Sequence, residues 1–375
     1  MKPEKGTISG LQMALMLYPA VIATAFLTLP TITAQYAGND LWLTPILSGI
    51  SGALTLFLAV RLHRLYPGQT IIEYSVKIVG IVPGKIIGFA YFIYLLYLTG
   101  VIARQYAEFV KSAIMFKTPL LVILSSILLL AAIAARGGVE LIARAATILT
   151  PVFVIPSFVL LLLLPDLNVQ HLFPVLEKGW IPVLKGSLAP NAYTSEFFLM
   201  TFFLPLLSNP EKGAKWAAIS IAADLISGLY ASLLVLFLLG PDTADKVYPV
   251  LTAFRYISLA NFFENLEALL VAMWIIGNFL KLSVFLYAAS ASLVQTLELK
   301  EYRMVVYPLA VWCLLFSLWD NPDLPSLGNH IKYTSPFELL AFFNGIPLLL
   351  LLAASARQVL KGSPNPPAKG KNAVE

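Results

Sequence analysis

The chain has 375 residues, of which 59% are hydrophobic and only 12% charged, with a formal net charge of +5 and a mean hydropathy of +0.82. A soluble domain carries roughly 25% charged residues, so this composition excludes an ordinary water-soluble protein. Apolar runs of about 20 residues recur along the chain, each long enough to cross about 30 Å of hydrocarbon. The sequence therefore predicts an all-α polytopic membrane protein.

No familiar catalytic or metal-binding motif is present. The single Cys313 excludes a disulfide framework and a cysteine metal site, and the histidines His63, His171 and His330 lie far apart in the sequence. Without a nucleophile–base pair or a ligand cluster, we expect no enzyme activity, no metal and no cofactor. The excess of Lys and Arg fits loop charges that orient a membrane protein, so we expect no nucleic-acid partner.

Ten membrane spans are predicted in chain order, separated mostly by short loops with turn residues. They cover residues 9–36, 41–62, 84–115, 119–135, 140–164, 184–208, 214–240, 262–297, 303–319 and 335–359. The connection 165–183 is too short to span and is expected to lie at the membrane interface. The chain then forms one transmembrane domain, 1–361, with a Pro- and Lys-rich cytoplasmic tail, 362–375, that we expect to be disordered.

Loop charges favour an orientation with both termini in the cytoplasm. Fifteen Lys and Arg residues fall on the side of the N-terminus and seven on the other side, which is the usual cytoplasmic bias. An even number of spans also requires both termini to lie on one side. Three cationic residues remain within spans: Arg104, Arg144 and Lys281. Arg144 is close enough to a span end to reach the interface, so we assign it an orienting role.

The first and sixth spans are interrupted by prolines and by small or polar residues. The first reads YPAVIATAFLTLP, with Ala23, Thr24 and Ala25 between its prolines. The sixth contains SLAPNAYTSEFF, with Asn191, Ala192, Tyr193, Thr194 and Glu196 after Pro190.

Interruptions at corresponding positions of two five-span halves, 9–164 and 184–359, are typical of a 5+5 inverted repeat. In such a repeat the freed backbone groups of spans 1 and 6 bind substrate or ions at mid-membrane. An ordinary proline kink is the alternative, and for span 1 taken alone it is the better interpretation. The paired positions favour a binding site, although the sequence assigns no role to Glu196.

Span 3 carries an ionisable pair, since Arg104 and Glu108 are four residues apart on one helical face. Tyr97 lies on the same stripe. An ionisable group at the membrane centre costs at least about 2.5–3.5 kcal/mol, so each normally faces a partner or a cavity. Two interpretations stay open: an ion pair that locks spans together, or one that gates the outer half of the protein.

Span 8 carries a longer polar stripe, because Glu267, Trp274, Asn278 and Lys281 share one helical meridian, with Glu264 to the side. Lys281 falls near the middle of the span, too deep to reach the interface easily. The stripe is interpreted either as a contact between helices or as the lining of a translocation or binding cavity. The depth of Lys281 favours the cavity.

These motifs together resemble the B subunits of the GerA-type spore-germination nutrient receptors, a branch of the amino acid–polyamine–organocation superfamily. The resemblance covers roughly residues 7–360 and rests on ISGLQ, LTLP before QYAGND, RQYAEFVK, APNAYTSEFF and FENLEALLVAMWIIGNFLKLSVFLY. It implies ten transmembrane helices in the leucine-transporter fold, with a pocket between spans 1, 3, 6, 8 and 10. It also implies a nutrient-sensing role in the inner membrane of a dormant endospore, in complex with a membrane A subunit and a lipoprotein C subunit.

The resemblance also implies roles for individual residues. Backbone groups at Ala23, Thr24 and Ala25 would face an amino acid's carboxylate, and the run Asn191, Ala192, Tyr193 and Thr194 would face its ammonium. Tyr97 would cap the pocket from outside, and Phe342 would form part of its wall. In sodium-coupled members of this fold a sodium ion lies between spans 1 and 8, where Lys281 would replace it. This chain departs from relatives that often carry glycines at the span-1 break.

Two functions follow as expectations. The first is a sensor that binds a small nutrient, in the first instance an amino acid, and relays its closure to partner subunits. The alternative is a permease for amino acids or related solutes, either sodium-independent or coupled to protons through Glu196, Glu264 or Glu267. One scaffold can host both activities, so the fold does not separate them.

Overall fold

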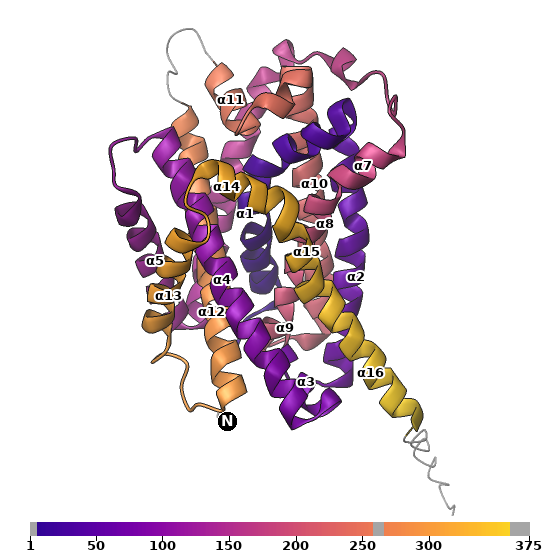
Figure 1. Cartoon of the computed structure of the whole chain (residues 1–375), viewed down its shortest axis with the longest axis vertical. Helices are drawn as coiled ribbons and strands as arrows, with labels where there is room; N and C mark the ends of the chain where they lie inside the picture. Colours follow the sequence, from indigo (N-terminus) through magenta and orange to yellow (C-terminus); the bar gives the residue numbers. More distant parts are fainter. Residues whose placement is uncertain (1–5, 258–265, 361–375) are drawn as a thin grey trace, which may run out of the picture.

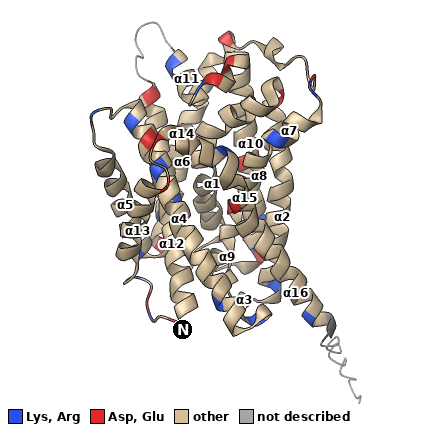
Figure 2. Cartoon of the chain, viewed as in Figure 1, with Lys and Arg blue, Asp and Glu red and all other residues tan. Residues whose placement is uncertain are grey.

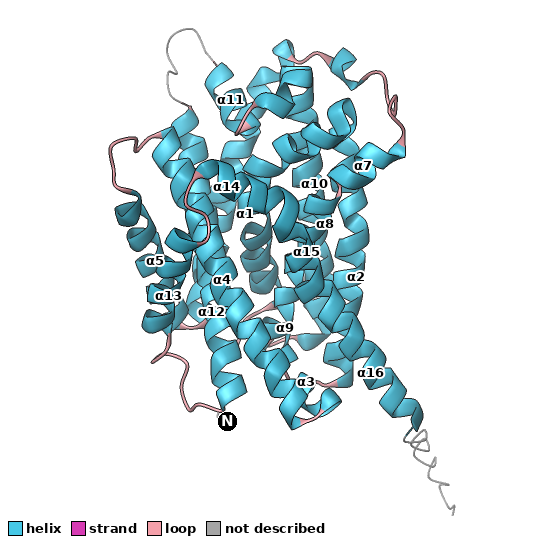
Figure 3. Cartoon of the chain, viewed as in Figure 1, coloured by secondary structure: helices cyan, strands magenta, loops and turns pink. Residues whose placement is uncertain are grey.

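The computed structural model describes residues 6–257 and 266–360, which are helical almost throughout and, within those ranges, contain no strand (Figure 3). Glu264 and the tail 362–375 lie outside the described residues. The α-helices are α1 (Gly10–Ala37), α2 (Leu43–Leu65), α3 (Ile71–Val79), α4 (Ile81–Ala113), α5 (Leu120–Gly137), α6 (Val139–Val154), α7 (Trp180–Gly186), α8 (Leu188–Ser195), α9 (Met200–Phe203), α10 (Gly213–Leu239), α11 (Pro249–Tyr256), α12 (Glu267–Leu297), α13 (Val306–Trp319), α14 (Leu324–Asn329), α15 (Ser335–Leu340) and α16 (Ile346–Leu360).

Tighter and wider turns join these helices and extend several of them. The 3-10 segments are η1 (Gly38–Trp42), η2 (Ile155–Asp166), η3 (Val169–Leu172), η4 (Glu196–Leu199), η5 (Leu204–Leu206), η6 (Pro210–Lys212) and η7 (Gly240–Asp245). Two π-helical turns, η8 (His330–Thr334) and η9 (Ala341–Gly345), lie on either side of α15.

The long helices form an integral membrane bundle. Seven described helical stretches are long and apolar enough to cross a membrane, and the first of them, Gly10–Leu65, contains both α1 and α2. The short apolar helix α13 and the segmented stretch from α7 to η5 complete the ten predicted spans. Charged side chains gather at the two ends of the bundle and are sparse in the band between (Figure 2).

The two ends of the bundle differ in their elements (Figure 1). In Figure 1 the start of α1 and the end of α16 lie at the end that carries α3, which we call the termini end. The opposite end carries α7 and α11 and is called the α11 end. The helices α1 and α12 run through the interior of the bundle, where α12 packs along both α1 and α4.

Span 1 differs from its prediction, because α1 is one continuous helix through Ala23, Thr24 and Ala25. These residues do not favour an opening: alanine is the strongest helix former, and no glycine is available there. The Thr28 hydroxyl also donates to the Thr24 carbonyl at 2.9 Å, which adds to the local bonding. The predicted break at this position is therefore wrong, and Pro30 is accommodated inside the helix.

Span 6 is segmented as predicted, but the change of helix type comes later. Residues Asn191 to Thr194 lie within α8, and the α-helix gives way to the 3-10 turn η4 at Glu196. Asn191 is held in the helix because its amide donates to the Ser187 carbonyl at 2.8 Å. The irregular part of the span is thus centred on the carboxylate whose role the sequence left open.

A short helix, α3, occupies part of the predicted loop between spans 2 and 3. Its signal is present in the sequence: Thr70 and Glu73 form a capping box, in which each side chain binds the other residue's backbone N–H. At nine residues, α3 is too short to cross the membrane, and it packs against the start of α4.

We predict that Gly277→Val strongly destabilises the bundle. A Cβ at Gly277 would lie 2.8 Å from the Ala23 Cβ and 2.6 Å from a ring carbon of Phe153, so α1 and α12 would have to separate. Overpacking of this kind costs about 1–3 kcal/mol of unfolding free energy. Thermal unfolding of the detergent-purified chain measures the loss.

Gly328→Ala is the matched control, because a Cβ at Gly328 in α14 meets nothing within 4 Å. It should leave the melting temperature unchanged or slightly higher, since alanine favours a helix over glycine. Equal melting temperatures for the two variants would contradict the close approach of α1 and α12.

Candidate functional site

A buried ion pair lies at the middle of the bundle. The Lys281 ammonium of α12 donates to a Glu196 carboxylate oxygen of η4 at 2.6 Å, and the two side chains are 0% and 2% exposed. Removing two charges from water costs several kcal/mol each, which is recovered only when the charges meet in good geometry. The pair therefore fixes the position of η4 relative to α12.

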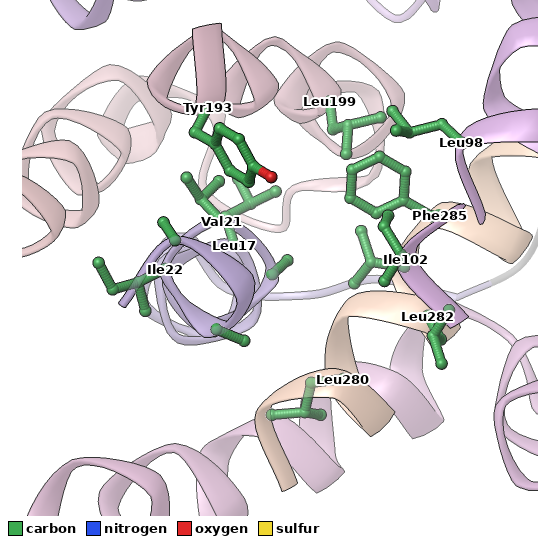
Figure 4. Packing of buried hydrophobic residues seen from close by; sticks show 14 of the residues in the cluster. Leu17, Val21, Ile22, Leu98, Ile102, Tyr193, Leu199, Leu280, Leu282 and Phe285 are labelled. Carbon is green, nitrogen blue, oxygen red and sulfur yellow. The ribbon is translucent and has the colours of Figure 1, made fainter. Parts of the chain in front are cut away.

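Aromatic rings surround the ammonium. Its Nζ lies 5.5 Å from the ring centroid of Tyr193 and 5.3 Å from that of Phe285, within the range of cation–π attraction. Figure 4 shows Tyr193, on α8, and Phe285, on α12, among the apolar side chains Val21 and Ile102 of the core. The rings exclude water from the pair and leave Lys281 with one hydrogen-bonded acceptor, Glu196.

A second buried acid, Asp224 of α10, lies near the pair. It is 6% exposed and feels the charges of both Glu196 and Lys281. One carboxylate oxygen is 3.5 Å from the Thr194 hydroxyl, and the other has no hydrogen-bond partner. Asp224 was not among the predicted residues, although its signal was available as the one acid within the apolar run Gly213–Leu239.

Two spaces adjoin these groups. A cavity of about 30 Å³, lined by Asp224, Tyr193 and Thr194 among others, lies between α1, α2, α8 and α10. A larger space of about 390 Å³, which we call the vestibule, is lined by residues of α1, α4, η7, α14 and η8. Only the vestibule has room for an amino acid, since about 30 Å³ holds roughly two waters.

Polar side chains from two spans line the vestibule. The Gln105 amide donates to the Thr28 hydroxyl at 3.3 Å, and both residues line this space. The Tyr193 hydroxyl lies within hydrogen-bonding reach of both. Tyr193 itself lines the cavity beside Asp224, so its side chain reaches from that cavity toward two residues of the vestibule.

The vestibule is bounded on one side by α14, whose start is capped by Asp323. The Asp323 carboxylate accepts the Ser326 N–H at 2.8 Å, and the Ser326 hydroxyl and N–H together hold the pKa of that carboxyl below its usual range. Lys332 of η8 donates to Gln35 of α1 at 2.8 Å and so closes part of the rim.

Only some of the predicted residues of spans 1 and 6 line the small cavity. Ala25, Tyr193 and Thr194 line the small cavity, and the hydroxyl of the fully buried Thr24 has no partner. Ala23 packs against the Gly277 position, and Ala192 is buried. Asn191 faces α2, where its side-chain oxygen accepts the Ser51 N–H at 3.3 Å.

Tyr97 and Phe342 contact residues outside the two spaces. The Tyr97 hydroxyl donates to Asp320 at 2.6 Å, and its ring packs on Phe316 of α13. Phe342 stacks on Tyr94 with centroids 3.9 Å apart. Neither residue lines either of the two spaces described above.

Arg104 and Glu108 form the predicted pair, at 2.7 Å, with side chains 6% and 15% exposed. The guanidinium also donates to the Pro322 carbonyl at 2.7 Å and to the Ser317 carbonyl at 3.3 Å. These bonds fasten the connection between α13 and α14 to α4. The geometry therefore contains the interhelical lock that the sequence left as one of two interpretations.

The predicted polar stripe of span 8 is divided. Trp274, Asn278 and Lys281 are buried, whereas Glu267 lies at the start of α12 and is paired with Arg255. Among the described residues no group of three or more His, Cys, Asp or Glu side chains could hold a metal ion.

The N-terminal segment is fastened to other elements at the termini end. Ile8 pairs with the segment after span 6, donating to the Leu206 carbonyl at 3.0 Å and accepting the Ser208 N–H at 2.9 Å. The Thr7 N–H donates to Glu140 of α6, and the Gly10 N–H donates to Asn209, both at 2.9 Å. This N-terminal strap ties α1, α6 and the end of span 6 together.

Comparisons with known proteins place the chain among relatives. A family model described as spore germination protein matches residues 7–324. Spore germination protein YndE and spore germination protein KB, both of Bacillus subtilis (strain 168), are each 26% identical to the chain over 94% of its length, and over 97% and 95% of their own lengths.

Solved structures match the fold over nearly the whole chain. MhsT in complex with L-phenylalanine has a TM-score of 0.64 at 13% identity, covering 94% of this chain and 100% of MhsT. Mhp1, a nucleobase-cation-symport-1 family transporter, has a TM-score of 0.67 at 13% identity, covering 95% and 79%. A Na+-coupled sialic acid symporter has a TM-score of 0.69 at 11% identity, covering 96% and 91%. These transporters share the leucine-transporter fold, which confirms the predicted fold class.

Lys281→Met is expected to lower the unfolding free energy by about 3–5 kcal/mol, because it leaves Glu196 as an unpaired buried carboxylate. Glu196→Gln should cost a similar amount by leaving the ammonium unpaired. The double variant, in which both charges are removed, should recover most of the loss. Thermal unfolding of the four proteins completes the cycle.

Lys85→Met is the matched control, since Lys85 also pairs with a carboxylate, Glu298, at 2.8 Å, but with side chains 42% and 73% exposed. Solvent screens an exposed pair, so its loss should change the unfolding free energy far less than loss of the buried pair. If Lys281→Met lowered the unfolding free energy no more than Lys85→Met does, the buried Lys281–Glu196 pair would not be a main source of stability.

Proposed function

The chain belongs to the spore germination protein family, and we propose that it is the membrane subunit of a germinant receptor. In this proposal it binds a small nutrient, in the first instance an amino acid, at a site between α1 and α8. The binding is relayed to a membrane A subunit and a lipoprotein C subunit. The complex resides in the inner membrane of the endospore, with both termini of this chain in the cytoplasm.

The vestibule is the observation that carries the proposal. At about 390 Å³ it has room for an amino acid, and it reaches Thr28 and Gln105, whose side chains lie within hydrogen-bonding reach of the Tyr193 hydroxyl. A receptor needs a nutrient to reach its site from one side of the membrane and a conformational change to be transmitted to its partner subunits. It does not need a continuous path.

The proposed nutrient site begins at the base of the vestibule. Gln105 and Tyr193 supply amide and hydroxyl groups there, and the unpartnered hydroxyl of Thr24 lies on the same helix as Thr28. Backbone and side chains of Ala23, Ala25, Asn191, Ala192 and Thr194 remain the proposed walls, with Tyr97 and Phe342 outside them. Because the space next to Thr194 is only about 30 Å³, the nutrient must widen it on binding.

The ion pair supplies a way to transmit that widening. Glu196 lies one turn after Tyr193 at the point where α8 becomes η4, and Lys281 connects it to α12. A nutrient that moves α8 therefore pulls on α12 through a strong contact. We expect Arg104 and Glu108 to control the outer end of the same movement, because Arg104 fastens the segment before α14. A ligand shifts such an equilibrium only by its differential affinity for the two states.

A transporter is the second candidate, because the solved structures that share the fold include a nucleobase-cation-symport-1 family transporter and a Na+-coupled symporter; the fold itself does not separate the two candidates. A permease would carry amino acids or related solutes, either without sodium or with protons. Uptake of labelled amino acids into proteoliposomes that contain the chain alone separates the two candidates. We expect no concentrative uptake; uptake above that of empty liposomes in a proton gradient would favour the permease.

Nutrient binding is tested by thermal unfolding of the full-length purified chain against a panel of L-amino acids. At least one should raise the melting temperature of the wild type. Gln105→Leu and Tyr193→Phe each remove a polar group at the base of the vestibule and should weaken that binding about tenfold, the value of one lost hydrogen bond.

Gln170→Leu is the control, because Gln170 is an exposed residue of η3 outside the vestibule. It should bind the amino acid as the wild type does. If Gln105→Leu and Tyr193→Phe both kept wild-type affinity, the site would not lie at the base of the vestibule. If no amino acid stabilised the wild type, the proposed class of nutrient would be wrong.

A further inference from the structure

The small cavity between α1, α2, α8 and α10 has an unusual lining. It contains one carboxylate, Asp224, and several hydroxyl groups within an otherwise apolar wall. Four of these hydroxyls donate their only proton to a carbonyl three or four residues earlier in the chain: Thr33 to Pro30, Thr44 to Leu41, Ser48 to Pro45 and Thr194 to Pro190, at 2.7–3.1 Å. A hydroxyl whose proton is used in this way offers only lone pairs to other groups.

Asp224 adds a charge to this set of acceptors. It is buried, one of its oxygens has no partner, and the other is 3.5 Å from a Thr194 hydroxyl whose proton is already directed to Pro190. A buried carboxylate without donors is costly. The cavity therefore presents a carboxyl group and oxygen lone pairs, and one oxygen of Asp224 is left without a donor.

The charges of the neighbourhood are unbalanced as well. Glu196 already takes the Lys281 ammonium at 2.6 Å, and Asp224 interacts electrostatically with both of these groups without a hydrogen bond to either. With both carboxyl groups ionised, the two carboxylates and one ammonium carry a net charge of −1. One further positive charge beside Asp224 would make the cluster neutral.

We propose that this cavity is an ammonium-binding subsite, in which Asp224 is the counter-ion of a primary ammonium group. The N–H groups of such a cation match lone pairs from several directions, and its size suits a cavity of about 30 Å³. The ammonium belongs either to the nutrient, in which case the inference rests on the proposed function, or to a free small ammonium ion. Either source requires the same Asp224 chemistry.

Tyr193 gives the subsite its connection to the vestibule. Its ring lines the cavity, and its hydroxyl lies within reach of Gln105 and Thr28 at the base of the vestibule. A nutrient held at that base would point its ammonium past Tyr193 toward Asp224. The lysine of the central pair is not available for this role, because its ammonium is bound to Glu196.

Free ammonium ions test the cavity itself. Ammonium and methylammonium chloride, added to the full-length purified chain at constant ionic strength in a sodium chloride background, should raise the melting temperature in a saturable way. A rise of about 2–4 °C is expected at ten times the Kd. Tetramethylammonium has no N–H and is too large for the cavity, so it should give no shift.

Asp224→Asn should abolish this response, because it replaces the charge by an amide of the same shape that carries its own N–H donors. Asp242→Asn removes the same charge from an exposed position of η7 and should respond as the wild type does. Gly228→Ala is a second variant that keeps Asp224 but narrows the cavity. Its added methyl would lie 3.4 Å from Pro45, an ordinary contact, so the variant should fold and bind the cations more weakly.

Amino acids test whether the nutrient supplies the ammonium. Glycine and L-alanine are compared with glycolate and L-lactate, which carry a hydroxyl in place of the ammonium. A shift with the amino acids alone, lost in Asp224→Asn, assigns the nutrient's ammonium to the subsite. A shift with ammonium and methylammonium alone, again dependent on Asp224, supports a free ion and contradicts the proposed amino acid ligand.

Two results would overturn the subsite. One is a wild type and an Asp224→Asn variant that respond equally to every amine tested. The other is a wild type that responds to amino acids but not to their ammonium groups, so that glycolate and L-lactate shift it as much as glycine and L-alanine do. Either result would leave nutrient binding in the vestibule unaffected.

Discussion

The structure depends on one contact between opposite charges that no water reaches. Lys281 and Glu196 meet at 2.6 Å in a bundle whose other interior contacts are mostly apolar and non-directional. Apolar packing tolerates many helix registers, whereas a buried ammonium has to find its carboxylate. The pair therefore sets the rotation of α12 and the point at which α8 tightens into η4. Tyr193, one turn before Glu196, takes its place between the cavity and the vestibule as a consequence.

The two ends of the bundle are held by different kinds of bond. At the termini end, backbone groups of Ile8 pair with the chain near residue 207, in a manner independent of side-chain charge. Near the α11 end, Arg104 binds Glu108, the Ser317 carbonyl of α13 and the Pro322 carbonyl of the α13–α14 connection. The segment beyond that connection contains two π-helical turns, η8 and η9, which occur mainly where a helix serves a function. Of these two turns, η8 lines the vestibule through Ile331 and Lys332.

Local sequence signals predicted the features that depend on neighbours along the chain. Hydropathy alone gave the spans, and the spacing of four residues gave the pair Arg104–Glu108, because both depend on the geometry of a single helix. The depth of Lys281 was also apparent from its place within span 8. Its partner was not, because Glu196 is 85 residues away and the choice among several acids is made by tertiary packing. Asp224 was not predicted for a simpler reason: no charged residue lies three or four positions from it in α10, so no helical spacing marks it as half of a pair.

Span 1 is a continuous helix, although its sequence carries prolines and small residues at positions that match those of span 6. Prolines and small residues at matching places in two halves predicted matching breaks, yet only span 6 changes helix type. Alanine and threonine keep α1 helical through Ala23–Ala25, and the neighbouring helices bury that stretch completely. A pattern can locate the place where a helix is free to open, but the balance between opening and packing depends on contacts that are far apart in the chain.

The N-terminal strap has a consequence for how the protein is made. The partners of Ile8 are the residues that follow span 6, so the strap cannot form until about half of the chain has entered the membrane. During synthesis α1 therefore precedes five further spans before the hydrogen bonds of Ile8 can form. Contacts of such long sequence separation form late, because the entropy of closing the loop has to be met first. Ile8 thus reaches its final position only after span 6 is in place, although it precedes all ten spans in the chain.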